Sequence, residues 1–176
     1  MDKEQVMDLN ALRKITYGMF VVASKKGDKI NGQIANTVFQ VSAEPPLIAI
    51  SINKLNLTHE YISESKVFSA AVLSEDTQMT YIGLFGFKSG RDTDKFKASK
   101  YKTGVTGVPI ALDFTIAYFE CEVIGSYDAG THTIFVGKAV GSEILDDTKE
   151  PMTYAYYHEV KKGFSPKTAP TYIPKT

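Results

Sequence analysis

The chain has 176 residues, one cysteine, and twenty basic side chains that balance twenty acidic ones, so its formal net charge is zero. This length predicts one domain, and the neutral balance argues against the positive field that non-specific nucleic-acid binding requires. A single cysteine excludes an internal disulfide, and no apolar run is long enough for a membrane-spanning helix. Because the charged start at residues 1–5 is followed by no apolar core, we expect no secretory signal and a cytoplasmic location.

The first third of the chain predicts one helix and two strands. Apolar residues at helical spacing indicate a helix over residues 2–15, and strand formers follow at 17–24. Lys26-Gly27-Asp28 is typical of a hairpin turn. A second strand is expected over residues 33–42, broken near Ala35-Asn36 and ended by Pro45-Pro46, because a proline has no N–H to donate to a ladder.

Residues 47–53 alternate cleanly and predict a strand with two unlike faces. Ile48, Ile50 and Ile52 point to one side, and small or polar residues point to the other, namely Ala49, Ser51 and Asn53. A face of small polar groups leaves room for a ligand. An ordinary half-solvated strand predicts the same alternation.

The remaining elements predict a mainly β fold. We expect a helix over 58–65, a strand over 67–73, and a helix capped by Ser74-Glu75-Asp76 that runs to Phe85. A long surface loop is expected over 86–107, then strands over 115–124, with Glu120 and Glu122 outward, and over 133–144. Residues 159–176, with their prolines, are expected to form a C-terminal extension. Several strands with few helices indicate a β-barrel with helical additions.

The residues carry few chemical motifs. The usual phosphate loops, the hydrolase elbow and the zinc-protease helix are missing from the sequence, and the three histidines are far apart, so we expect no metal site. The segment Asn53–Thr58 leads directly into a predicted helix, whose free N–H groups, together with Lys54 and Thr58, would suit a phosphate. Asn56 or Thr58 as a plain N-cap explains the same residues.

From Gly32 to Ser42, followed by Pro45-Pro46, the sequence resembles the flavin reductase family, whose domains have the FMN-binding split-barrel fold. Further matches follow in order over nearly the whole chain. They are Asn53–Thr58, Ser89–Asp92, Asp94–Phe96, Gly130–Gly137, Met152–His158 and Lys161–Gly163. The Gly-Thr-His-Thr form at residues 130–133 and the tyrosine-rich end are similar to a subgroup that includes the archaeal ferric reductase and the flavin domains of high-molecular-weight rubredoxins.

The resemblance implies one split-barrel domain over residues 1–176, with six strands, short peripheral helices and a C-terminal extension. It also implies a homodimer with one FMN per subunit. The segment from Gln33 to Thr37 would run along the isoalloxazine ring, and Ala49, Ser51 and Asn53 would form the flavin-side wall. Asn53, Lys54 and Thr58 would be phosphate ligands at a helix start, and Lys95 would contact a phosphate of flavin or of the pyridine nucleotide. The cofactor-binding residues are then Gln33, Ile34, Ala35, Asn36, Thr37, Ser51, Ile52, Asn53, Lys54, Thr58 and Lys95.

The activity implied by the resemblance is hydride transfer from NADH or NADPH to bound FMN, followed by electron transfer to free flavin, a ferric complex or rubredoxin. His132 is the candidate for the nicotinamide side, and a surface histidine in a hairpin turn is the alternative. Lys95 is either a phosphate contact or a solvated lysine. Thr131 stands where reductases that serve monooxygenases usually have aspartate, which argues against such a partner.

Two other functions stay open at this point. One is an electron-transfer flavoprotein with poor direct reactivity toward NAD(P)H, and the other is a non-enzymatic FMN-binding protein. Because the sequence contains no Cys-x-x-Cys iron module, we expect any rubredoxin or flavodiiron partner to be a separate protein. The resemblance implies neither a nucleic acid nor a membrane as partner.

Overall fold

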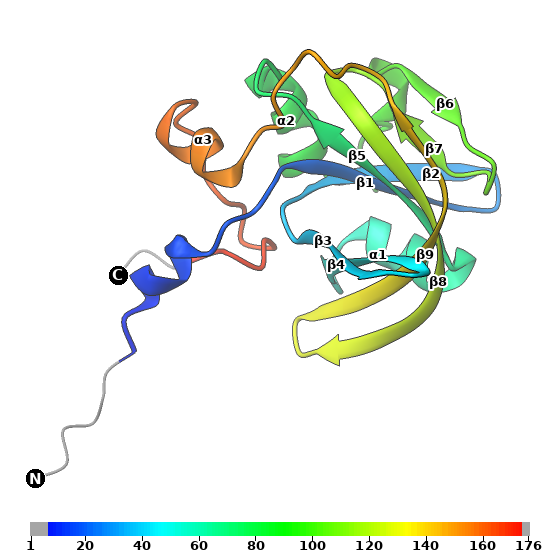
Figure 1. The fold of residues 1–176 in the computed structure, drawn as a ribbon, viewed down its shortest axis with the longest axis horizontal. Coiled ribbons are helices and arrows are strands. Elements are labelled where there is room, and N and C mark those ends of the chain that lie inside the picture. Colours follow the sequence, from blue (N-terminus) through cyan, green and yellow to red (C-terminus); the bar gives the residue numbers. More distant parts are fainter. Residues whose placement is uncertain (1–6, 174–176) are drawn as a thin grey trace, which may run out of the picture.

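The computed structural model describes residues 7–173 (Figure 1). The expected helix over 2–15 lies partly outside these residues. Its described part is a short 3₁₀ helix, η1 (Leu9–Lys14), rather than an α-helix. No residue of η1 is buried, so no packing supports a longer helix, and the Asp8 side chain caps it by accepting from the Asn10 N–H.

The main sheet confirms the mainly β fold class, with seven antiparallel strands rather than six. The order across the sheet is β2-β1-β5-β8-β9-β4-β3. The expected strand over 33–42 is divided between two strands, which accounts for the extra one. The strands are β1 (Phe20–Lys26), β2 (Lys29–Ala35), β3 (Val38–Ala43), β4 (Pro46–Asn53), β5 (Val67–Leu73), β8 (Thr115–Ala129) and β9 (His132–Ile144).

Only Asn36 and Thr37 join the two opposite edges of this sheet. Ala35 ends β2 beside Phe20 of β1, and Val38 begins β3 beside Ile50 of β4. Three Cα–Cα steps span at most about 11 Å, whereas the edges of a flat seven-stranded sheet would lie about 29 Å apart. The sheet must therefore curl until its edges nearly meet at this link, which gives an open barrel (Figure 1).

The helices and a small hairpin cover the curled sheet. They are α1 (Leu57–Ser65), α2 (Met79–Phe87), η2 (Phe96–Ala98) and α3 (Tyr154–Glu159), with β6 (Tyr101–Thr103) pairing with β7 (Pro109–Ala111). Both faces of β1 are covered: Val22 belongs to one core cluster with Ile62 of α1, and Val21 to another with Ile82 of α2. Within residues 7–173, no helix is long and apolar enough to cross a bilayer.

The expected cap at Ser74-Glu75-Asp76 is wrong, because these residues do not begin a helix. The Ser74 N–H donates to the carbonyl of Phe114, and Ser74 forms an isolated bridge with Pro151. Because Ser74 pairs with Phe114 and Pro151 in an extended arrangement, it cannot cap the helix. The helix α2 begins only at Met79, with Gln78 as its N-cap.

Glu120 is buried, which contradicts its expected outward position. Glu120 lies on the same side of β8 as Tyr118, which packs in one core cluster with Ile110 and Ala111 of β7, so the β6–β7 hairpin covers this side of the strand. The Glu120 side chain is 2% exposed, and one carboxylate oxygen accepts from both the N–H and the hydroxyl of Thr106, each at 3.0 Å. Glu120 therefore holds the β6–β7 turn against the sheet.

Glu120→Ala should lower the free energy of unfolding by about 2 kcal/mol, since it removes two hydrogen bonds to a buried charge. The matched control is Glu122→Ala, which changes an exposed glutamate of the same strand and should shift stability by less than about 0.5 kcal/mol. Urea denaturation measures both. Equal losses in the two variants would contradict the role of Glu120.

Candidate functional site

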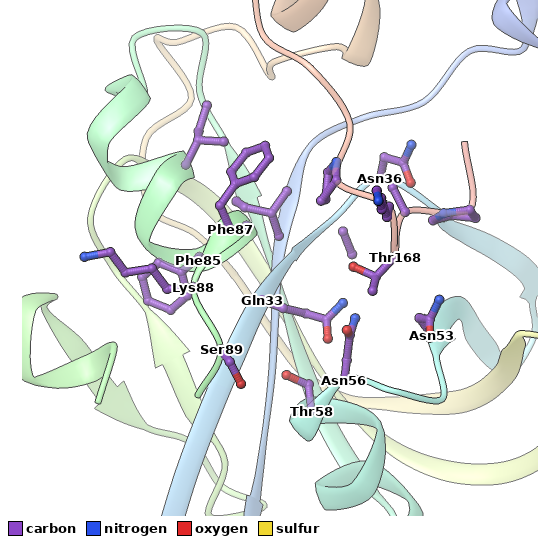
Figure 2. A pocket seen from close by; sticks show the side chains of 18 of the residues that line it. Gln33, Asn36, Asn53, Asn56, Thr58, Phe85, Phe87, Lys88, Ser89 and Thr168 are labelled. Carbon is purple, nitrogen blue, oxygen red and sulfur yellow. The ribbon is translucent and has the colours of Figure 1, made fainter. Parts of the chain in front are cut away.

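A cavity of about 370 Å³ lies between β2 on one side and the end of β4 with the start of α1 on the other (Figure 2). This volume falls within the range of about 300–1,000 Å³ that is usual for small-molecule sites. The end of α2, the loop that follows it, and the C-terminal segment complete the walls. The lining residues from β2 and β4 are Asn31, Gln33, Ile34, Ala35, Ser51 and Asn53.

One end of the cavity is suited to an anion. Asn56 is the N-cap residue of α1 but makes no side-chain cap, and the N–H groups of Leu57 and Thr58 have no hydrogen-bond acceptor among the described residues. The Thr58 side chain is fully buried, and its oxygen accepts from Asn31 at 2.8 Å, so its own proton is available to a ligand. Free N–H groups at a helix start carry partial positive charge and bind phosphate readily.

Ser89 and Gly90 bring a second backbone segment to this end of the cavity. A Cβ added at Gly90 would lie 2.0 Å from the side-chain oxygen of Asn31, so only glycine permits this approach. Figure 2 shows Gln33, Asn56, Thr58 and Ser89 turned toward the same part of the cavity. The backbone and side chains together form an anion cradle.

The cavity also contains an unpaired polar atom. The side-chain oxygen of Gln33 is buried and has no hydrogen-bond partner within residues 7–173. A buried acceptor without a partner is costly, so a ligand N–H or O–H that reached this oxygen would be stabilised. Asn53 uses its oxygen to accept from the Leu55 N–H, at 3.0 Å. Ile34, Ile82 and Phe87 supply apolar surface alongside these groups.

Lys95 lies in the cavity wall and is 4% exposed, so it is not a solvated lysine. Its ammonium donates to the carbonyls of Gly32, at 2.9 Å, and Phe85, at 3.1 Å, and therefore ties β2 to the end of α2. Burial lowers the pKa of Lys95 to about 8, because the carbonyls do not replace the water that a charged ammonium loses.

The structure brings most of the predicted site residues to the cavity, namely Gln33, Ile34, Ala35, Asn36, Ser51, Asn53, Thr58 and Lys95. The other four do not line it. Lys54 pairs with Asp128, at 2.7 Å, and points to the β8–β9 hairpin, whereas Ile52 is fully buried in the core. The carbonyl of Thr37 accepts from the Ser51 N–H, at 3.1 Å, so Thr37 supports the wall from behind.

His132 is also outside the cavity lining, although it is only 7% exposed. Its Nε2 bonds to the carbonyl of Thr168, at 3.1 Å, and Thr168 does line the cavity. His132 therefore contacts the site through the C-terminal segment.

Several lining residues were missed by the sequence analysis. Asn31 lies on a strand of which only the second half was expected, and Phe87 to Gly90 lie at the end of α2 and just after it, where a long surface loop was expected. The sequence did not indicate that the C-terminal segment from Phe164 to Pro170 lines the cavity. The prolines predict an extension, but they do not predict the part of the fold against which it packs.

The fold and the cavity together define an open β-barrel protein with a small-molecule cavity, one end of which is suited to an anion. The family model described as "Flavin reductase like domain" matches residues 12–163. This chain belongs to the flavin reductase family, because the match covers well over half of its length.

Three known proteins are similar over most of the chain. A high molecular weight rubredoxin from Moorella thermoacetica is 51% identical over 166 residues, covering 94% of this chain and 72% of the relative. A ferric-chelate reductase (NAD(P)H) from Archaeoglobus fulgidus is 46% identical over 167 residues, covering 95% of this chain and 98% of the relative. The solved structure of an FMN-binding protein from Thermus thermophilus, with bound p-hydroxybenzaldehyde, superimposes with a TM-score of 0.73 at 27% identity. The match covers 86% of this chain and 85% of that protein.

The buried lysine makes the stability of the flavin-free protein depend on pH. The pKa of Lys95 is lower in the folded chain than its ordinary value of 10.5, so between the two values the unfolded chain binds a proton that the folded chain does not. Stability relative to Lys95→Met should therefore rise with pH, by about 2 kcal/mol between pH 8 and about 9.5. Guanidinium denaturation at the two pH values measures it. A constant difference would show that Lys95 titrates normally.

Proposed function

We propose that this chain is an FMN-dependent oxidoreductase that takes hydride from NADH or NADPH and passes the electrons to a second acceptor. Membership of the flavin reductase family and the likeness to a ferric-chelate reductase (NAD(P)H) support this activity. The observation that carries the proposal is one cavity that combines an uncapped helix start with the unpaired oxygen of Gln33.

The cavity fits FMN at both ends. The phosphate would bind at the start of α1, to the N–H groups of Leu57 and Thr58 and to the Thr58 hydroxyl, with Ser89 and Gly90 beside them. The isoalloxazine ring would lie against Ile34 to Asn36, where its polar edge offers an N–H to the Gln33 oxygen. Ser51 and Asn53 would form the opposite wall.

The residues of this chain would bind and orient rather than exchange protons. Bound FMN supplies the hydride and electron chemistry, so no side-chain acid or base is required. Gln33 and the backbone of the β2–β3 link would hold the ring edge, and α1 would fix the phosphate. Lys95 would act by keeping β2 and α2 at a fixed separation, because its ammonium is already bonded to two carbonyls.

The proposal is tested by adding FMN to the purified protein and then NADH and NADPH separately, without oxygen. We expect tight flavin binding and bleaching of the flavin absorbance within seconds with at least one donor. A protein that binds no flavin would contradict the proposal. A yellow protein that is reduced by dithionite but by neither donor would show that it is not an NAD(P)H reductase.

Thr58→Val should weaken binding of FMN but not of riboflavin, which has no phosphate. The loss of one hydrogen bond to a charged group should raise the dissociation constant for FMN about tenfold to a hundredfold. Thr58→Ser keeps the hydroxyl and is the matched control. Fluorescence titration with both flavins measures the effect, and an equal loss of affinity for FMN and riboflavin would place the phosphate elsewhere.

Rubredoxin is a second candidate acceptor, beside ferric complexes and free flavin. It is favoured because a relative 51% identical to this chain is a high molecular weight rubredoxin. Stopped-flow mixing of the reduced protein with oxidised rubredoxin or with a ferric chelate distinguishes the acceptors. Fast transfer to rubredoxin with slow reduction by NAD(P)H would favour an electron-transfer flavoprotein over a reductase.

A homodimer is proposed from exposed apolar residues on the edge strand β3 and on the β8–β9 hairpin. Phe39 of β3 pairs with Ala49 of β4, Ala49 pairs with Val136 of β9, and Val136 pairs with Gly125 of β8. Phe39, at one end of this row, is 53% exposed, and Tyr127, two residues beyond Gly125, is 70% exposed. An unpaired edge strand with such residues is a usual site of association.

We also propose a cytoplasmic location, because the pyridine nucleotide donors are found there.

The double change Phe39→Lys and Tyr127→Lys should convert the dimer to a monomer, because it places four charges in each two-fold interface. Sedimentation velocity should then report a mass near 19.4 kDa. The control is Val105→Lys, which changes an exposed residue, 81% accessible, in the turn between β6 and β7. A monomeric unmodified protein would contradict the dimer.

A further inference from the structure

The segment from Phe164 to Thr171, here called the strap, passes over the mouth of the cavity. After α3 the chain turns back toward the barrel, and six strap residues line the cavity, from Phe164 and Pro166 to Pro170 (Figure 1). Figure 2 shows Thr168 of the strap among the labelled lining residues from β2 and β4. A ligand in the cavity would therefore be enclosed by residues from opposite ends of the chain.

Four hydrogen-bonded positions hold the strap. Tyr157 accepts from the Phe164 N–H at 3.2 Å and donates to its carbonyl at 3.0 Å. Ser165 bonds to the Tyr154 hydroxyl. Asn36 donates to the Thr171 hydroxyl at 3.0 Å, and His132 bonds to the Thr168 carbonyl at 3.1 Å. The last two attach the strap to the barrel rather than to α3.

The proton on His132 is fixed by its two partners. The Thr168 carbonyl can only accept, so Nε2 must carry the proton, and burial lowers the pKa of His132 and favours the neutral ring. Nδ1 is then an acceptor, and the Thr131 hydroxyl donates to it at 2.8 Å. The Thr168 carbonyl thus sets the tautomer, and the Thr131 hydroxyl is compatible with it because it can donate to Nδ1.

The strap is attached by these bonds more than by packing. None of its residues belongs to either core cluster, and Phe164 is 67% exposed, in contact with the ring of Phe87 at 4.7 Å between centroids. Lys162, in the left-handed region at φ 56°, and Gly163, which lies against the Tyr157 ring, form a turn at its start. Segments with few buried apolar contacts open locally at low cost in free energy.

We propose that the strap opens and closes over the flavin cavity, that His132 is the positioning residue that latches it, and that the strap selects acceptors by size. The proposal rests on the proposed function, since it concerns access to bound FMN. A closed strap leaves room for small acceptors, whereas a protein acceptor requires the open form. Pro166 and Pro170 restrict the free strap, so closure costs less conformational entropy and few bonds suffice.

The test measures amide hydrogen exchange and acceptor use in three variants. His132→Ala removes the latch, His132→Gln restores an N–H donor, and Thr171→Val removes the independent bonds to Asn36 and Tyr154. The matched control is His59→Gln, because His59 bonds to Thr133 and does not touch the strap. The acceptors are a small ferric chelate and oxidised cytochrome c, used as a protein-sized probe.

We expect exchange in residues 164–171 to accelerate about fivefold in His132→Ala, the effect of losing one hydrogen bond, and by a larger factor in Thr171→Val, which loses two, with the sheet unchanged. The rate with cytochrome c should rise relative to the rate with the chelate by a similar factor, and His132→Gln should reverse both effects. Unchanged strap exchange, or equal changes with both acceptors, would overturn the proposal. Failure of the proposed function shows separately, because the unmodified protein would then not bind FMN or be reduced by either donor.

Discussion

The structure depends on the two-residue link between β2 and β3. Because Asn36 and Thr37 must join opposite edges of a seven-stranded sheet, the sheet has to curl until those edges approach each other. Beyond Asn36 and Thr37, no described backbone pairing connects β2 with β3, and the cavity lies in the gap between these two edges. The covalent connection therefore creates both the barrel and the gap in it.

The same constraint explains why the site is polar and fixed. The residues of β2 that line the cavity lie directly before the link, and Ser51 of β4 is bonded to the carbonyl of Thr37 within it. On the side that faces the gap, β2 has no neighbouring strand to pair with its polar groups. The side-chain oxygen of Gln33 on β2 is buried and has no hydrogen-bond partner among the described residues. A flavin with a polar ring edge would satisfy it, and the gap that the topology imposes would then serve for binding.

Local sequence patterns predicted the elements near the cavity well. The alternation at 47–53 placed Ser51 and Asn53 on one face, and the approach to the helix at 58–65 placed Thr58 at its start, because both depend on residues close in sequence. The resemblance predicted the fold class and the family. Long-range features were not predictable: the burial of Glu120 under the β6–β7 hairpin and the pairing of Lys54 with Asp128 arise from contacts between residues that are distant in sequence.

The C-terminal segment illustrates the same limit. Its composition indicated an extension, but its position over the cavity depends on bonds to Asn36 and His132, which lie more than thirty residues away in sequence. His132 was predicted to lie on the nicotinamide side of the pocket, and that role stays a prediction. Its observed partner is the Thr168 carbonyl, a contact that no local pattern encodes.

The measurement that tests the central claim most directly is a crystal structure of the protein with FMN. The account predicts that the phosphate lies within hydrogen-bond distance of the Leu57 and Thr58 N–H groups and that the ring edge donates to the Gln33 oxygen. A phosphate bound away from α1, or a ring outside the gap between β2 and β4, would contradict it.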